Sequence, residues 1–251
     1  MLSYLLCVCS SWTPVLHQHI AKSFLYEYYD YIPEELKYSF ICGSIYADGF
    51  NKSITHSTKS VLDILYSINC TDSEEFWFFL GIFSHIVCDC FAHSGSKTSF
   101  ITNIGTMHHI SELVVCSYIF TRGNIEYILI RYNLSQIMKK YHIEEKKSFK
   151  LIYPLCYTVS ILPLWAFLPS IEKGNCISSS LSDPEYHFLQ HYASMQSAMK
   201  KIIHKVLDKS MTYSDMGKIT TEFLNSSSCS PQVTQGSFFS RIFVLFGPFL
   251  L

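Results

Sequence analysis

The chain has 251 residues, enough for one large domain with its own hydrophobic core or at most two small ones. Hydrophobic residues make up 49% of it and aromatic residues 16%, which excludes a disordered chain. Its 19 basic and 20 acidic residues give a formal net charge of -1, which argues against a nucleic-acid-binding surface built from lysine and arginine.

The first eleven residues, MLSYLLCVCSS, have the pattern of a short secretory signal peptide. Residues 2–9 are apolar, and small residues occupy the first and third positions before Trp12. The alternative is a buried first turn of a helix, because signal peptides usually have about 15–30 residues. Ten cysteines and four glycosylation sequons also fit export. We expect residues 1–11 to be removed and the mature chain to be secreted or held at the cell surface.

Helical patterns follow one another along the rest of the chain. The helix at the centre has Ser73 as a cap candidate and Glu74 in its first turn. No alternating strand pattern of useful length and no internal repeat is visible. We therefore predict an all-α protein with a single multi-helix domain over residues 12–225. The expected helices cover about residues 14–29, 57–67, 73–93, 107–123, 124–141, 148–167 and 184–209.

Two hydrophobic segments suggest contact with a membrane. Residues 151–171 carry no charge and are long enough to span a bilayer, but three prolines interrupt them, so a buried central helix is the preferred interpretation. Residues 226–251 form a polar spacer and a hydrophobic tail, the outline of a lipid-anchor signal. Arg241 interrupts this tail, and a packed terminal segment is the simpler alternative.

The central helix carries ionisable side chains in an otherwise apolar run. His85, Asp89 and His93 follow at intervals of four residues and so share one face. Burying them unpaired would cost several kcal/mol, so a partner must hold them there. The two histidines are roughly 12 Å apart along the axis, too far to share one ion. We expect His85 and Asp89 to hold one metal and His93 another, with Asp89 placed to bridge a pair of ions.

The next expected helix supplies matching ligands. His108 and Glu112 are four residues apart and can chelate one ion, with His109 as the alternative to His108. A single histidine on an apolar helix face is more often a hydrogen-bonded core residue, but two such pairs close together favour a metal site. The whole set of five histidines and three carboxylates is more than one zinc needs. The remaining candidates lie upstream: His17, Asp48 and His56.

These residues together resemble the zinc-dependent phospholipase C family. The stretch FLGIFSHIVCDCFAHS is most similar to the phospholipase C/D-type domain found in glycosylphosphatidylinositol-specific phospholipase D, and the resemblance covers about residues 12–122. The chain also resembles, more distantly, the fungal single-strand nucleases, which have the same site of three zinc ions. The interval between Asp48 and His56 is shorter than is usual in the family. The full series is Trp12, His17, Asp48, His56, His85-x-x-x-Asp89-x-x-x-His93 and His108-x-x-x-Glu112.

The resemblance implies an all-α domain that cleaves phosphodiesters with up to three zinc ions. Asp48 would also orient or deprotonate a zinc-activated water, as a role secondary to ligation. The implied ligands are Asp48, His56, His85 and Asp89 for the first zinc; His93, His108 and Glu112 for the second; and Asp89, His17 and the freed amine and carbonyl of Trp12 for the third.

The charge of such a site suits a phosphodiester substrate. Three Zn²⁺ ions against three carboxylates leave about +3, which attracts an anionic phosphodiester, and zinc lowers the pKa of its bound water to about 7. We expect an exported zinc hydrolase that cleaves phospholipids at the membrane surface as a peripheral enzyme. One alternative is a nuclease-like phosphodiesterase, although no Lys/Arg cluster lies near the ligands. The other is a non-catalytic surface or secreted binding protein that keeps the fold.

Two aromatic runs are candidates for a membrane-contacting surface. They are YEYYDY at residues 26–31 and FWFF at residues 76–79. Packing in the core is the simpler interpretation of both, because large aromatic side chains are mostly buried.

Overall fold

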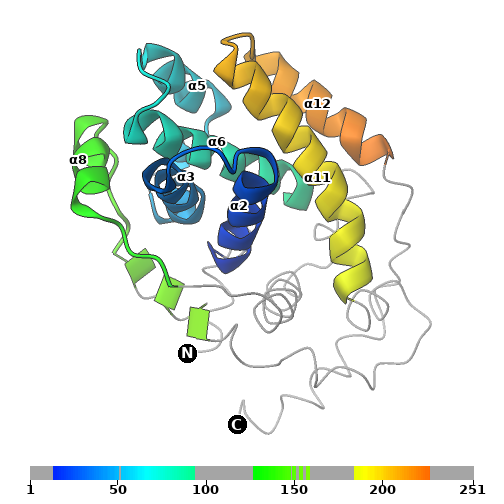
Figure 1. Ribbon diagram of the computed structural model, residues 1–251, viewed down its shortest axis with the longest axis horizontal. Helices are drawn as coiled ribbons and strands as arrows, with labels where there is room; N and C mark the ends of the chain where they lie inside the picture. Colours follow the sequence, from blue (N-terminus) through cyan, green and yellow to red (C-terminus); the bar gives the residue numbers. More distant parts are fainter. Residues whose placement is uncertain are drawn as a thin grey trace, which may run out of the picture.

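The computed structural model describes residues 14–50, 52–93, 127–147, 149–150, 153–154, 157–158 and 184–226. Within these ranges the chain forms helices and no strand, and one isolated bridge joins Phe50 to Glu145 (Figure 1). The predicted all-α fold is confirmed. The elements are α2 (Pro14–Tyr28), α3 (Glu34–Tyr46), the 3₁₀ turn η1 (Ala47–Gly49), α4 (Lys52–Thr55), α5 (Thr58–Ser67), α6 (Glu74–His93), α8 (Tyr132–Lys140), α11 (Pro184–Leu207) and α12 (Tyr213–Ser226).

The predicted helices agree with α2, α5, α6 and α11, whose ends lie within two residues of expectation. The helix expected over residues 124–141 is wrong in part, because residues 127–131 are extended and α8 begins only at Tyr132. Two tyrosine hydroxyls hold this stretch, since Tyr38 donates to the carbonyl of Leu129 and Tyr46 to that of Ile128. α3, α4 and α12 were not predicted from the sequence.

Several expectations fall on residues that the structure does not describe. They include the signal peptide, the helix expected over 107–123 and most of the uncharged run 151–171. Among the described helices, none combines the length and the apolar character that crossing a membrane requires. The polar spacer and tail expected after residue 225 also lie outside, apart from the last residue of α12.

The core is built around α6, which packs against α2, α3, α5 and α11. At its start the Ser73 hydroxyl accepts a hydrogen bond from the Phe76 N–H at 3.2 Å, and Glu74 and Glu75 complement the positive end of the helix dipole. The FWFF run is buried, which confirms its expected core role. In YEYYDY that expectation is wrong for Tyr26 and Tyr31, which are 46% and 81% exposed.

Two glycines let α3 and α6 cross with their backbones in contact. A Cβ atom at Gly43 would lie 2.0 Å from the carbonyl oxygen of Phe78, and one at Gly81 would lie 2.0 Å from that of Phe40. No side chain larger than hydrogen fits either position. The crossing brings Ser44, the neighbour of Gly43, opposite His85 on α6, with 3.0 Å between the Ser44 oxygen and the His85 Nδ1.

Candidate metal centre

Five of the eight predicted side-chain ligands come together where α2, η1 and α6 meet. His17 lies in the first turn of α2, Asp48 lies in η1, and His56 follows α4 directly. His85 and Asp89 stand one turn apart on α6. The remaining predicted ligands lie outside what the structure describes: the amine and carbonyl of Trp12 and the side chains of His93, His108 and Glu112.

The carboxylates of Asp48 and Asp89 stand among three histidine rings. The Nε2 atom of His56 is 3.1 Å from Asp48 Oδ1 and 3.8 Å from Asp89 Oδ2. The Nε2 atom of His85 is 3.7 Å and 3.3 Å from the same two oxygens. The other oxygen of Asp89 is 3.4 Å from His17 Nε2, so this carboxylate faces histidines on both sides. A carboxylate that bridges two metal ions would have this arrangement of histidines around both of its oxygens.

Within the described residues, two groups have ligand atoms close enough to hold one ion each. His17, Asp48 and His85 form one group, and His56, His85 and Asp89 form the other, with all ligand atoms of a group within 4.8 Å of one another. The rings pack tightly: His17 stacks on His85 at 3.8 Å between centroids, and His56 meets His85 edge-on at 5.2 Å. His17 and His85 are fully buried.

A backbone carbonyl orients the ring of His85. A carbonyl oxygen can only accept, so the Nδ1 of His85 donates its proton to the Ser44 oxygen. In the neutral ring, Nε2 therefore carries the lone pair and faces Asp48 and Asp89. Metal-bound histidines commonly have such a partner on the other nitrogen.

A hydroxyl orients His56 in the same sense. The single proton of the Thr55 hydroxyl goes to the Ala47 carbonyl at 2.9 Å, so its oxygen accepts from His56 Nδ1 at 3.1 Å. The Nε2 of His56 is thereby directed at Asp48. Sequence reasoning did not find Ser44 or Thr55, because a backbone carbonyl and a lone hydroxyl leave no characteristic spacing.

This donor set fits a divalent cation. Lone pairs on imidazole nitrogens that face carboxylate oxygens repel one another unless a positive charge lies between them. The buried Nε2 of His85 has no aligned hydrogen-bond partner, although both carboxylates are within 3.7 Å. Imidazole and carboxylate are also ligands that zinc accepts.

The electrostatics show the same demand for positive charge. Burial alone would lower the pKa of His85, but Asp89 and Asp48 outweigh burial and raise it to about 10. Burial lowers the pKa of His17 to about 4, with help from the neighbouring His85. Burial would raise the pKa of both carboxyls, yet the histidines hold it below the usual range. The two carboxylates stay ionised, and a proton on His85 occupies a place that a metal ion would take.

Comparison with known protein families agrees with the predicted metal ligands. A family model described as zinc-dependent phospholipase C matches residues 16–159, more than half of the chain. No curated protein and no solved structure gives a significant match. The matched region contains every predicted side-chain ligand from His17 to Glu112.

Proposed function

This chain belongs to the zinc-dependent phospholipase C family, and we propose from this that it is an exported zinc phosphodiesterase that hydrolyses phospholipids. The family supports a zinc-dependent hydrolase. One observation carries the assignment to this cluster: two histidines, each fixed through Nδ1, direct Nε2 at the same pair of carboxylates. Burial of these side chains without a metal ion gives no reason for that convergence.

The five residues of the cluster would have different roles as metal ligands. Asp48, His56 and His85 with one oxygen of Asp89 would hold the first zinc, and the other oxygen of Asp89 with His17 would serve a neighbouring ion. When bound, zinc lowers the pKa of a coordinated water and polarises the phosphoryl oxygens. The histidines around Asp48 keep its pKa low, which makes it a weak base. Asp48 would therefore orient water more readily than deprotonate it.

Export and action at a membrane rest on the sequence. They are supported by the signal-like residues 1–11 and by the sequons. Two sequon asparagines, Asn69 and Asn133, lie at exposed positions of the described chain, which is where glycosylation requires them. The substrate class is supported by the family name, which specifies a phospholipase.

The proposal is tested with the purified full chain loaded with zinc. We expect zinc in the protein by elemental analysis and release of phosphorylated headgroup or phosphatidic acid from phosphatidylcholine or phosphatidylinositol micelles. Chelation should abolish the release, and added zinc should restore it. Hydrolysis of single-stranded DNA or RNA in place of lipid would identify a nuclease instead. Stoichiometric zinc without any hydrolysis would identify a binding protein.

A further inference from the structure

The extended segment Tyr127–Arg131 presents apolar side chains to solvent. Its backbone is held by three tyrosines, because Ile128 also donates its N–H to the hydroxyl of Tyr153 at 3.2 Å, beside the bonds from Tyr38 and Tyr46. Side chains of an extended chain alternate between two faces. The outward face carries Tyr127, 38% exposed, Leu129, 63% exposed, and Arg131.

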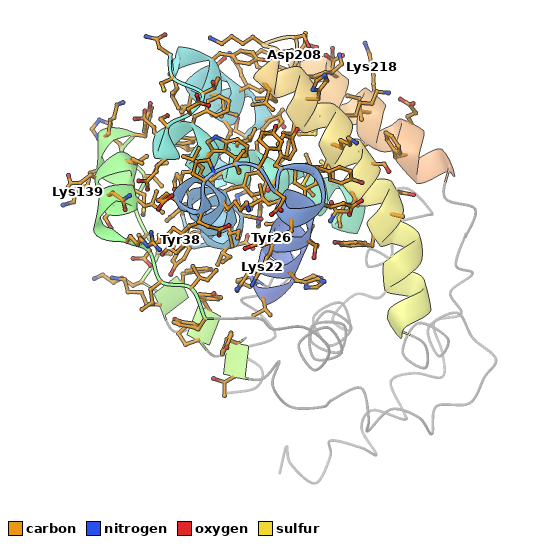
Figure 2. All side chains as sticks on the ribbon, viewed as in Figure 1. Lys22, Tyr26, Tyr38, Lys139, Asp208 and Lys218 are labelled. Atoms are coloured by element: carbon orange, nitrogen blue, oxygen red, sulfur yellow. The ribbon has the colours of Figure 1, made fainter. Side chains whose placement is uncertain are left out.

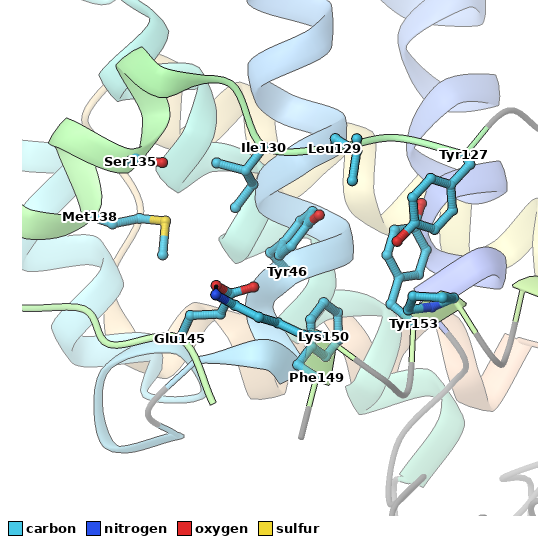
Figure 3. A pocket seen from close by; sticks show the side chains of 11 residues that line it. Tyr46, Tyr127, Leu129, Ile130, Ser135, Met138, Glu145, Phe149, Lys150 and Tyr153 are labelled. Atoms are coloured by element: carbon cyan, nitrogen blue, oxygen red, sulfur yellow. Dashed lines mark ion pairs between the residues drawn. The ribbon is translucent and has the colours of Figure 1, made fainter. Parts of the chain in front are cut away.

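A cavity of about 420 Å³ opens beneath this segment (Figure 3). Tyr127 and Leu129 form its upper rim, and Met138, Phe149 and Tyr153 line it from other elements. Glu145 and Lys150 form an ion pair of 3.3 Å at its lower edge. The result is an apolar hollow beside exposed apolar side chains and a charged edge, which is the layout of an interfacial surface.

The segment that borders the cavity has more basic than acidic residues. Residues 131–150 contain six basic side chains and two acidic ones, and two of the six are paired, Lys140 with Glu75 of α6 and Lys150 with Glu145. Arg131 lies over the ring of Tyr38 at 3.8 Å, and Lys139, Lys147 and Lys150 are exposed. Anionic phospholipid surfaces attract such clusters, with about 1 kcal/mol for each lysine or arginine near the surface.

This surface is physically continuous with the metal centre. Tyr46 lines the cavity, and Asp48 follows two residues later. Lys146 donates to the Asp48 carbonyl at 2.9 Å through its ammonium and to the Gly49 carbonyl at 2.6 Å through its N–H. A membrane held against the cavity would therefore lie next to the turn that carries a proposed zinc ligand.

We propose that residues 127–150 form a docking surface for anionic phospholipid bilayers. Tyr127 and Leu129 insert between the lipids, the cavity receives acyl chain, and the basic residues contact anionic headgroups. The assignment deepens the proposed function and rests on it, because it states how a phospholipase of this kind reaches its substrate. Exposed apolar side chains beside a surplus of cations are the combination by which interfacial proteins bind anionic lipid, and this favours a bilayer as the occupant.

The test is sedimentation of the zinc-loaded full chain with vesicles. One set contains phosphatidylcholine alone, and the other contains roughly one third phosphatidylglycerol, to which we expect tighter binding that weakens with salt. Leu129→Gln keeps the carbonyl that Tyr38 binds and should weaken binding by about tenfold. Lys139→Glu and Lys147→Glu each reverse a charge and should weaken it by at least about tenfold.

Matched controls lie away from this surface. Lys218→Glu reverses a charge on α12, at the opposite edge of the molecule from Lys139 (Figure 2). Tyr31→Gln removes a more exposed aromatic ring from the turn between α2 and α3. Both controls should bind as the wild type does, and all variants should hydrolyse a monomeric, water-soluble aryl phosphodiester at the wild-type rate.

Three results would overturn the docking assignment. They are equal binding of neutral and anionic vesicles, vesicle binding that Leu129→Gln and Lys139→Glu leave unchanged, and a change of oligomeric state in these variants by light scattering. The last would make a second copy of the chain the occupant. Binding through this surface without hydrolysis of any phosphodiester would instead refute the proposed function alone.

Discussion

Substitution of Gly43 by alanine should damage the metal centre without touching a ligand. The new Cβ would lie 2.0 Å from the Phe78 carbonyl oxygen and 2.9 Å from the Ile82 nitrogen. Ordinary van der Waals contact of a Cβ atom is 3.4–4 Å, so α3 and α6 must separate by roughly 1 Å or more. The Ser44 oxygen would then stand about 4 Å from His85 Nδ1, beyond hydrogen-bonding distance.

The expected energy follows from three contributions. Alanine is favoured over glycine in a helix interior by about 1 kcal/mol. Forcing two packed helices apart costs about 1–3 kcal/mol, and losing the bond that orients His85 costs about 1 kcal/mol. The unfolding free energy of Gly43→Ala should therefore fall by about 1–3 kcal/mol. Zinc affinity should fall by roughly 10–100-fold, as it does when a bond that orients a metal ligand is lost.

Urea unfolding and zinc titration of the chelated protein measure both effects. Gly217→Ala on α12 is the matched control, because nothing lies within 4 Å of its added Cβ. That variant should gain about 0.5–1 kcal/mol and keep its zinc. If Gly43→Ala were stabilised like Gly217→Ala and bound zinc as the wild type does, the contact between α3 and α6 would not position His85.

Four further changes address single residues. Asp89→Asn should remove at least one zinc by elemental analysis and nearly all activity, since the carboxylate that faces histidines on both sides loses its charge; unchanged turnover would contradict this. Thr55→Val should weaken zinc binding by about 10–100-fold and Thr55→Ser should not, because only serine retains the hydroxyl that orients His56. The backbone N–H of Thr212 and the Lys205 ammonium lower the pKa of Asp215 in the folded protein. The ionised carboxylate therefore stabilises the fold above the pKa of the unfolded chain, and this contribution is lost as the pH falls through the pKa of the folded protein. Asp215→Asn should be destabilising at pH 7 and progressively less so in acid denaturation curves. A chain that begins at Trp12 should bind about three zinc ions by elemental analysis. A chain with one extra residue before Trp12 should bind about two, because an amide cannot replace the free amine as a ligand. Equal zinc content in the two chains would show that Trp12 is only a packed aromatic residue.

Polar surface explains why two helices were predicted from the sequence and why α3 was not. α5 and α11 alternate between buried and exposed faces, and α6 has a serine cap and an acidic first turn. α3 is buried on nearly all sides from Leu36 to Tyr46, so it has no polar face to reveal a helical period. Residues 127–131 are extended because hydroxyls distant in sequence bind their backbone, which no local pattern records.

The metal centre shows where local spacing stops being informative. The interval of four residues is enough to place His85 and Asp89 on one face, whereas Asp48 and His56 were assigned through the resemblance, with an interval shorter than usual. The structure accommodates the short interval with two single turns, η1 and α4. The Thr55 hydroxyl closes them by donating to the Ala47 carbonyl, and this bond leaves His56 Nε2 3.1 Å from Asp48. The hydrogen bond that closes the two turns therefore fixes how Asp48 and His56 face each other across this short connection.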